Sequence, residues 1–127
     1  MERQQVHGSP GGDRVTDDRG QSQLIDVPAI VAANEEPWIN FTLCEVNDAV
    51  VRLGIFQGEF HWHKHDEEDE LFFVLEGCLL LDLEERTVEL GPQQGWTVPR
   101  GVLHRTRAEE RTVCLMIERT GVEPRGD

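Results

Sequence analysis

Residues 61–77, HWHKHDEEDELFFVLEG, place three histidines within five positions just before a run of acidic side chains, and form the stretch best suited to chemistry. Because alternate side chains of a β-strand point to the same face, His63 and His65 are expected to project into one space, with Cα atoms ~7 Å apart. A turn at residues 66–69 leads to Glu70, and an antiparallel return of the chain would bring this carboxylate beside both imidazoles. The pattern predicts that the three side chains converge on one ion.

A third histidine, His104, lies in PRGVLHRTRA, where Pro99 and Gly101 favour a turn ahead of a strand. Three imidazoles and one carboxylate suit borderline divalent metals, which predicts one divalent transition metal per chain: iron, manganese, zinc, nickel or cobalt. Four protein ligands on an ion that can take six would leave two positions for water or substrate, unlike a closed structural zinc site. The alternative is that His104 is an ordinary core or surface histidine.

His61 shares the strand parity of His63 and His65, so its ring would face the same cavity. There it could act in catalysis as a general base, or donate a hydrogen bond to substrate, since its ordinary pKa is ~6.5. Glu59 has the same parity, although a place at the rim of the barrel is the simpler expectation. Residues 66–69 are most simply a solvated turn, and attraction of cations toward the site is their functional alternative.

The elements that must position these residues are short and mostly extended. Asp26 and Pro28 favour a short helix that closes before Pro37. From residue 38 to about residue 119, seven or more strand-like segments are separated by turns every eight to twelve residues, which is typical of an all-β sandwich or barrel. The segments are INFTLCEV, AVVRLGIF, GEFHWHKH, ELFFVLEG, CLLLDL, TVELG, GWTVP, VLHRTRA and RTVCLMIER. We expect residues 1–23 to be a flexible tail and residues 24–127 to form one domain.

Two motifs of this chain resemble those of the cupin superfamily. The first, H-x-H, three or four residues, E, six residues, G, is matched by His63, His65, Glu70 and Gly77. The second, P-x-G-x-x-H, is matched by PRGVLH, which ends at His104. The resemblance implies a cupin double-stranded β-helix (a jelly-roll barrel) over about residues 38–119, with the four predicted ligands as its metal site.

The chain is more narrowly similar to small single-domain cupins grouped with mannose-6-phosphate isomerase-like proteins. It departs from the motifs at two positions. Gln57 stands where the first motif has its leading glycine, with Gly58 one residue later, and Ala108 stands where the second motif usually ends in asparagine. Neither position holds a predicted metal ligand, so the departures affect any borrowed mechanism more than the site itself.

Apolar side chains fall on the strand parity opposite to the histidines. Phe56, Phe60 and Trp62 would point outward if the histidines point into the barrel, together with Leu71, Phe73 and Leu75 on the next strand. A patch this apolar is unfavourable in water. We expect it to form a homodimer interface, an assembly that the cupin resemblance also implies, and packing under the N-terminal helix is the alternative.

Composition limits the partners and the compartment. A net charge of −13 argues against binding to the nucleic-acid backbone or to anionic membranes. No apolar run approaches the ~20 residues of a membrane-spanning helix, and residues 1–15 have no secretory apolar region. The three cysteines, Cys44, Cys78 and Cys114, are scattered without a C-x-x-C pair, which indicates free thiols and a cytoplasmic location.

The predicted metal centre leaves two classes of function open. The first is a metal-dependent enzyme acting on a small polar molecule, by isomerase, lyase, cyclase or dioxygenase chemistry. The second is a non-catalytic module that binds a small molecule or a metal, and a metal-free structural barrel is the third alternative. A polar group near the metal, with Gln57, Glu59 and His61 as candidates, would favour an enzyme, whereas an apolar cavity would favour binding or a hydrophobic substrate.

Overall fold

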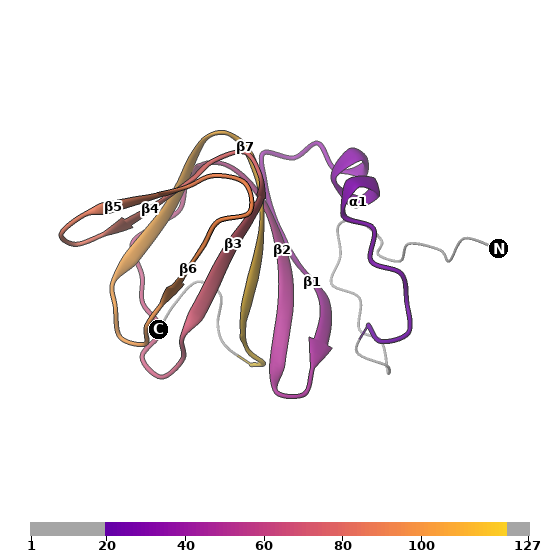
Figure 1. The fold of residues 1–127 in the computed structure, drawn as a ribbon, viewed down its shortest axis with the longest axis horizontal. Helices are drawn as coiled ribbons and strands as arrows, with labels where there is room; N and C mark the ends of the chain where they lie inside the picture. The colour runs from indigo at the N-terminus through magenta and orange to yellow at the C-terminus, as the bar shows by residue number, and fades with distance from the viewer. Residues whose placement is uncertain (1–19, 122–127) are drawn as a thin grey trace.

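The computed structural model describes residues 20–121 of the chain. Within them, one short helix precedes a set of antiparallel strands (Figure 1). The elements are α1 (Val27–Ala33), β1 (Trp38–Val46), β2 (Ala49–Glu59), β3 (Glu70–Glu76), β4 (Leu79–Leu83), β5 (Thr87–Leu90), β6 (Gly95–Val98) and β7 (His104–Arg119). The predicted all-β fold is confirmed.

The strand β7 holds the barrel together because it pairs with three other strands. Its C-terminal half lies between β2 and β3 in the order β1-β2-β7-β3-β6, and its N-terminal half pairs with β4, which carries β5 at its other edge. Figure 1 shows the β4–β5 hairpin on one side of the molecule and the β1–β2 hairpin with α1 on the other. The sequence predicts two strands here, VLHRTRA and RTVCLMIER, and the structure corrects them to one, because the chain stays extended across residues 109–110.

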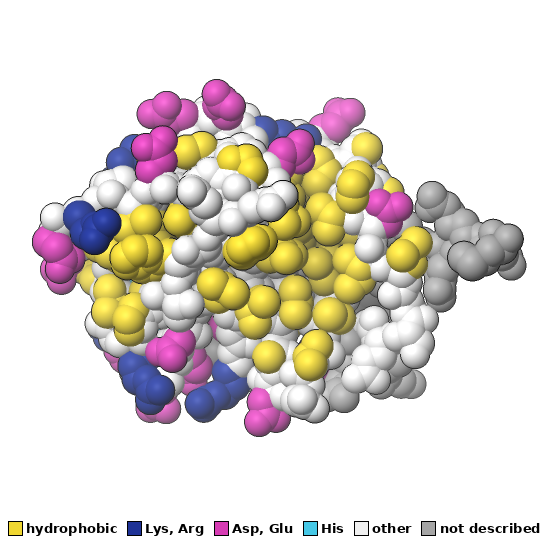
Figure 2. Space-filling view, in the orientation of Figure 1, with side chains coloured by type: hydrophobic (Ala, Val, Ile, Leu, Met, Phe, Trp, Pro, Cys, Tyr) yellow, Lys and Arg dark blue, Asp and Glu magenta, His cyan; other side chains and the backbone are white. Residues whose placement is uncertain are grey.

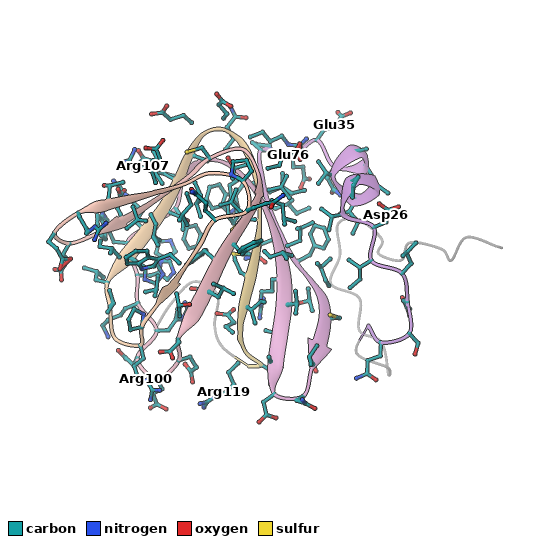
Figure 3. All side chains as sticks on the ribbon, viewed as in Figure 1. Asp26, Glu35, Glu76, Arg100, Arg107 and Arg119 are labelled. Carbon is teal, nitrogen blue, oxygen red and sulfur yellow. The ribbon has the colours of Figure 1, made fainter. Side chains whose placement is uncertain are left out.

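The helix α1 begins as predicted. The Asp26 side chain is the N-cap and accepts a hydrogen bond from the Ala29 amide, and Pro28 occupies the first turn, where a missing N–H costs nothing. The helix ends earlier than Pro37, at Asn34, whose side-chain amide donates to the Ile30 carbonyl. The labelled Asp26 lies beside this helix in Figure 3.

Apolar side chains form two separate clusters, one inside the barrel and one on the outer face of the β1-β2-β7-β3 sheet. The inner cluster contains Phe56, Phe72, Val74, Leu79, Leu81, Val88, Leu90, Val98, Ala108, Cys114 and Met116. The outer cluster lies under α1 and contains Ile30, Phe41, Leu43, Leu53, Ile55 and Val113. Near the helix, β2 and β7 therefore bury apolar side chains on both of their faces. This explains why their apolar runs are nearly continuous.

The predicted strand over residues 58–65 is wrong in its second half. β2 ends at Glu59, and the chain then continues irregularly to Glu70, apart from a single bridge between His63 and His104. A bulge between Phe56 and Gly58 shifts the register of β2 against β7, and Gly58 has a φ of 117°, which favours glycine.

Two aromatic residues do not take the predicted outward position. Phe56 is only 3% exposed in the inner cluster, and Phe60 lines an internal cavity beside His63. The alternation changes after Phe60, because the Phe60 amide donates to the Thr106 carbonyl and the His63 amide donates to the His104 carbonyl, so three residues match two on β7. One extra residue reverses the face of the side chains after it, which brings His63 to the same side as Phe60. Trp62 does lie outward, with 41% of its surface exposed, and Leu75 packs against the outer cluster under the helix.

The predicted flexible tail, residues 1–23, lies outside the described residues except for positions 20–23. There Gly20 packs so closely on β1 that an added Cβ would lie 2.6 Å from the Leu43 carbonyl oxygen. Among residues 20–121, no helix is long and apolar enough to cross a membrane.

Candidate metal centre

Four side chains meet at one point inside the barrel: His63, His65, Glu70 and His104. Each offers one ligand atom, and these atoms all lie within 4.8 Å of one another. The Oε1 atom of Glu70 lies 3.3 Å from the Nε2 atom of His65 and 3.6 Å from that of His104. All four residues are buried, so the fold brings together the whole predicted ligand set.

The backbone joins the segments that carry two of these histidines. The amide of His63 donates to the His104 carbonyl and the amide of His104 donates to the His63 carbonyl, each at 2.9 Å. The Gly101 amide donates to the His65 carbonyl at 2.8 Å, which ties the turn before His104 to the same irregular segment. These bonds fix the spacing of the imidazoles although residues 60–69 form no regular strand.

Backbone carbonyls also set the direction of two imidazole rings. The Nδ1 atom of His63 lies 3.0 Å from the His61 carbonyl oxygen, and that of His104 lies 2.9 Å from the Val102 carbonyl oxygen. Because a carbonyl can only accept, each Nδ1 must carry the proton and donate it. Each Nε2 is then unprotonated and presents its lone pair to the centre of the cluster, the tautomer that a metal ligand needs.

Burial and mutual contact shift the pKa values within the cluster. Burial lowers the pKa of His63 to about 4, so its ring is neutral at physiological pH. Burial alone would raise the pKa of Glu70, but its contacts with His104 and His65 outweigh that effect and lower the pKa to about 2. His63 therefore offers a neutral imidazole and Glu70 an ionised carboxylate, which are the forms that bind a divalent cation.

Two polar atoms of this cluster lack hydrogen bonds in the described part of the chain. These are Oε1 of Glu70 and Nε2 of His104, both buried. Buried polar atoms are nearly always hydrogen-bonded, because an unsatisfied one costs about 1–3 kcal/mol. Unsatisfied atoms that converge on one point are the expected mark of a cation site, so the donor set fits one borderline divalent metal.

A second buried carboxylate, Glu118, lies behind Glu70. The pairing of Leu71 with Ile117 places the preceding residue Glu70 opposite the following residue Glu118 on the inner face of the barrel. Glu118 is 5% exposed, and its Oε2 atom lies 3.2 Å from Nε of Arg52. Burial and the nearby charge of Glu70 raise the pKa of Glu118 to about 7. The motifs do not include this residue, and sequence reasoning missed it.

A cavity opens beside the cluster and is lined on one side by His63 and Glu70. Its other lining residues are Trp38, Asn40, Phe56, Phe60, Phe72, Thr106 and Met116. The cavity is partly open to solvent. Its lining could not be read from local sequence patterns, because it comes from β1, β2, β3 and β7 and from the irregular link between β2 and β3.

The three predicted polar candidates do not line this cavity. Gln57 and Glu59 are exposed and belong to a separate shallow surface hollow with Arg107. The His61 ring is exposed and stacks beside Phe60 at a centroid distance of 4.1 Å. The carbonyl of His61 orients the His63 ring. A catalytic role for the His61 imidazole remains a prediction.

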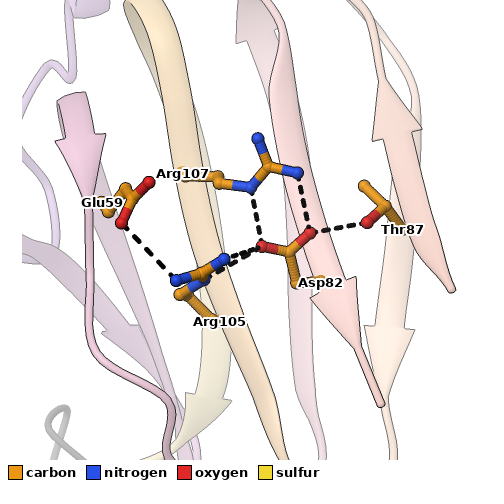
Figure 4. Close-up of polar contacts among 5 residues, drawn as sticks. All are labelled: Glu59, Asp82, Thr87, Arg105 and Arg107. Atoms are coloured by element: carbon orange, nitrogen blue, oxygen red, sulfur yellow. Dashed lines mark hydrogen bonds and ion pairs between the residues drawn. The ribbon is translucent and has the colours of Figure 1, made fainter. Parts of the chain in front are cut away.

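The most extensive ion-pair network among the described residues lies outside the barrel and is built differently. Asp82 accepts hydrogen bonds from Thr87, Arg105 and Arg107, and the guanidinium of Arg105 also contacts Glu59 at 3.5 Å (Figure 4). The hydrogen bonds from Arg107 hold the pKa of Asp82 well below its usual range. Every oxygen of this carboxylate is bonded, so the network joins β4, β5 and β7 and leaves no vacant position for a ligand.

Comparison with known proteins places this fold and site in a family. The sequence matches the family described as "Cupin domain" over residues 50–118. This chain is a cupin. It is 43% identical over 103 residues to an uncharacterized protein, YdbB, of Bacillus subtilis strain 168, an alignment that covers 80% of this chain and 91% of that protein.

Solved structures agree on the fold of this cupin. A crystal structure of a cupin-2 domain protein from Shewanella frigidimarina NCIMB 400 superposes with a TM-score of 0.72 at 29% identity, covering 76% of this chain and 94% of that one. The protein NMB1881 from Neisseria meningitidis superposes with a TM-score of 0.69 at 24% identity, covering 77% and 100% of the two chains. The predicted cupin β-barrel is therefore confirmed.

The two motif glycines of this cupin serve the backbone near the site. Gly77 has a φ of 89°, and an added Cβ would lie 2.6 Å from Oγ1 of Thr112, so a side chain is excluded there. Gly101 has a φ of 78° in the turn that leads to His104. The displaced glycine of the first motif, Gly58, lies at the register shift between β2 and β7 and has a φ of 117°.

Proposed function

We propose that this cupin is a metal-dependent enzyme that binds one divalent transition metal through His63, His65, Glu70 and His104. The substrate enters the adjoining cavity, where His63 and Glu70 form part of the wall. The observation that carries the proposal is the convergence of four buried ligand atoms, two of them without hydrogen bonds, beside an open cavity. Iron, manganese, zinc and nickel all suit this donor set.

The chemistry follows from which groups reach the cavity. A metal bound at these four residues would supply Lewis-acid activation of substrate oxygens, and iron or manganese would add redox chemistry. The protein orients His63 and His104 through backbone carbonyls, keeps the ring of His63 neutral, and surrounds the site with apolar side chains that exclude water. Isomerase, lyase, cyclase and dioxygenase reactions are all compatible with that arrangement.

A non-catalytic binding module is the second candidate, and one observation favours it. Apart from His63 and Glu70 themselves, none of the described residues lining the cavity titrates in the physiological range. An enzyme of this design must either use the metal and its ligands for proton transfer or catalyse a reaction that needs no separate base. A binding module needs neither.

A reaction screen distinguishes the two candidates. Protein without a histidine tag would be loaded separately with Fe²⁺, Mn²⁺, Zn²⁺ and Ni²⁺ and tested for oxygen consumption, enol–keto exchange and lyase activity on small carbonyl and phenolic compounds. We expect turnover with at least one metal, lost when Glu70 is replaced by Gln. Bound compounds with no turnover, for every metal, would contradict the enzyme and support the binding module.

We also propose that the protein forms a homodimer through the outer face of β3 and β7. Leu71, Phe73, Leu115 and Ile117 are half-buried on that face, and Figure 2 shows apolar side chains gathered across one face of the molecule with charged groups at its margins. Light scattering should give a dimer that Phe73→Glu converts to a monomer, while Trp62→Glu has no effect. A monomeric wild type at micromolar concentration would contradict this proposal.

Two further expectations belong with the proposal. All three cysteines are free, and burial raises the pKa of the Cys114 thiol to about 12, which fits unreactive thiols in the cytoplasm. The subgroup similar to mannose-6-phosphate isomerase would bind a sugar phosphate. The cavity gives that substrate little support, because no arginine or lysine is among its lining residues.

A further inference from the structure

We infer that the ligand of this cavity has a flat, largely apolar ring and a small oxygen-bearing group that reaches the metal. This inference rests on the proposed function, because it assigns a chemical class to the molecule that the metal centre would bind. Two features of the cavity support it, the side chains that form its walls and the charged side chains that its described lining does not contain.

Aromatic rings form one continuous wall of the cavity. The ring of Trp38 stacks on Phe56 with centroids 4.4 Å apart, and on Phe60 with centroids 5.5 Å apart and planes only 9° from parallel. The ring of Phe60 in turn meets His63 edge-on at 5.2 Å. The wall therefore runs from the mouth of the cavity to the candidate metal ligands, and a planar ligand ring could extend the stack.

Phe72 and Met116 complete the apolar part of the lining. Both are 3% exposed and belong to the inner core, so they keep this side of the cavity dry. A methionine beside aromatic rings makes favourable contacts with an aromatic ligand and adapts to its shape. A sugar would leave several hydroxyl groups without hydrogen-bond partners against these apolar side chains, which disfavours its binding.

Few polar side chains line the cavity apart from the metal centre. Among the described lining residues they are Thr106, which is buried, Asn40, which is exposed, and the indole N–H of Trp38. An exposed Asn40 suits a ligand with a polar group at the metal end and a second polar group facing solvent. The described lining contains no lysine or arginine, so a phosphate would have neither a bidentate partner nor a counter-charge there.

The lining defines the chemical class of the ligand. Aromatic and apolar walls beside the candidate metal centre suit a monocyclic aromatic or enolic compound that carries a carboxylate, phenol or carbonyl oxygen for the metal.

A matched pair of probes tests the ring without changing the metal-binding group. Benzoate and cyclohexanecarboxylate carry the same carboxylate, but only benzoate is flat. Zn²⁺-loaded protein would be titrated with each probe by calorimetry, and with mannose 6-phosphate as a polar comparison. We expect benzoate to bind at least about fivefold more tightly than cyclohexanecarboxylate, the factor expected for one aromatic stacking contact, and mannose 6-phosphate to bind more weakly than both.

Two leucine variants locate the effect. Phe60→Leu removes one ring of the wall and should lower benzoate affinity about fivefold while leaving cyclohexanecarboxylate unchanged. Trp62→Leu is the control, because Trp62 is on the same segment but exposed outside the barrel, beneath the guanidinium of Arg105. Circular dichroism would confirm that both variants are folded.

The metal content of each sample separates two kinds of failure. Protein that holds no zinc after loading contradicts the proposed metal site, whatever the probes do. Protein that holds zinc but binds both carboxylates equally, or prefers mannose 6-phosphate, overturns the inference about the ring and leaves the metal site intact.

Discussion

Two carboxylates of this barrel, Asp82 and Glu70, are almost equally hidden from solvent, with side-chain exposures of 6% and 8%. Asp82 faces outward and accepts hydrogen bonds from Thr87 at 2.7 Å, from Arg105 at 3.0 Å and from Arg107 at 2.7 and 3.0 Å. Glu70 faces inward, and its Oε1 atom is 3.3 and 3.6 Å from two imidazole nitrogens without a hydrogen bond.

The two sites differ in whether the carboxylate already has all of its bonding partners. Around Asp82 the compensating charge is permanent, because guanidinium groups stay protonated at any physiological pH. Near Glu70, the rings of His63 and His104 are oriented so that a lone pair, and not a proton, points inward. A complete network joins strands, whereas an incomplete one with converging lone pairs has room for a cation. Burial alone would not have told these two sites apart.

The largest effect should follow from Glu70→Gln. The amide keeps the shape of the side chain but removes the only charge that the four-residue cluster contributes, so we expect metal affinity to fall by more than about 100-fold. Competition with a fluorescent chelator would measure the affinity. Glu67→Gln, in the acidic turn nearby, is the control and should change affinity by less than about threefold, because Glu67 is exposed and exposed charges are screened. Equal effects of both variants would show that general negative charge, and not ligation, holds the metal.

The reciprocal change is Asp82→Asn. It leaves Arg105 and Arg107 without their shared carboxylate, and we expect the free energy of unfolding to drop by about 2–3 kcal/mol with no change in metal stoichiometry. Urea unfolding monitored by tryptophan fluorescence gives the first quantity and elemental analysis the second. Loss of metal in this variant at temperatures where it is still folded would break the distinction between the two carboxylates.

Glu118→Gln should have an intermediate effect on the metal centre. The wild-type carboxylate lies beside Glu70 and pairs with Arg52, so its removal weakens both the negative field and the support of the ligand carboxylate. We expect metal affinity to fall by about tenfold, as is typical of groups that support a ligand from behind. Glu110→Gln, exposed on β7, serves as the control. An unchanged affinity in Glu118→Gln would limit the Arg52–Glu118 pair to a structural role.

The pH dependence of the two sites should differ as well. The pKa of His63 is lowered to about 4 in the folded protein, below its ordinary 6.5, so the folded state resists protonation. The contribution of the neutral His63 ring to the free energy of unfolding is fully present above pH 6.5. It is lost as the pH falls from 6.5 toward 4. The pKa of Asp82 is also lowered, so its contribution is complete above its ordinary 3.8 and is lost only at lower pH. Metal release should therefore precede the loss of the Asp82 network in an acid titration, as followed by metal-indicator absorbance and circular dichroism. Simultaneous loss would contradict this order.

The sequence was sufficient for the fold class and for the cluster because both depend on local patterns. Turn residues at regular intervals predicted the strands, and the spacing of His63, His65 and Glu70 survived even though residues 60–69 are not a strand. Two backbone hydrogen bonds between His63 and His104 position these side chains, the role that strand parity was expected to have.

The rest depended on non-local features. The extra residue between Phe60 and His63 puts both on the cavity side, and no alternation pattern reveals such an irregularity in advance. Asn40, Thr106 and Glu118 reach the site through pairing registers between strands far apart in sequence. A useful sign was available for Glu118, which follows the apolar residues 113–117 of β7 and shares the parity of the buried Cys114 and Met116.

The central claim is that the four buried side chains bind one transition metal. Its most direct test is elemental mass spectrometry of protein purified without a histidine tag, alongside His104→Ala and His61→Ala. The account predicts about one metal per chain in the wild type and in His61→Ala, whose ring lies outside the cluster, and almost none in His104→Ala. Equal metal content in all three proteins, or none in the wild type after reconstitution with each candidate metal, would contradict it.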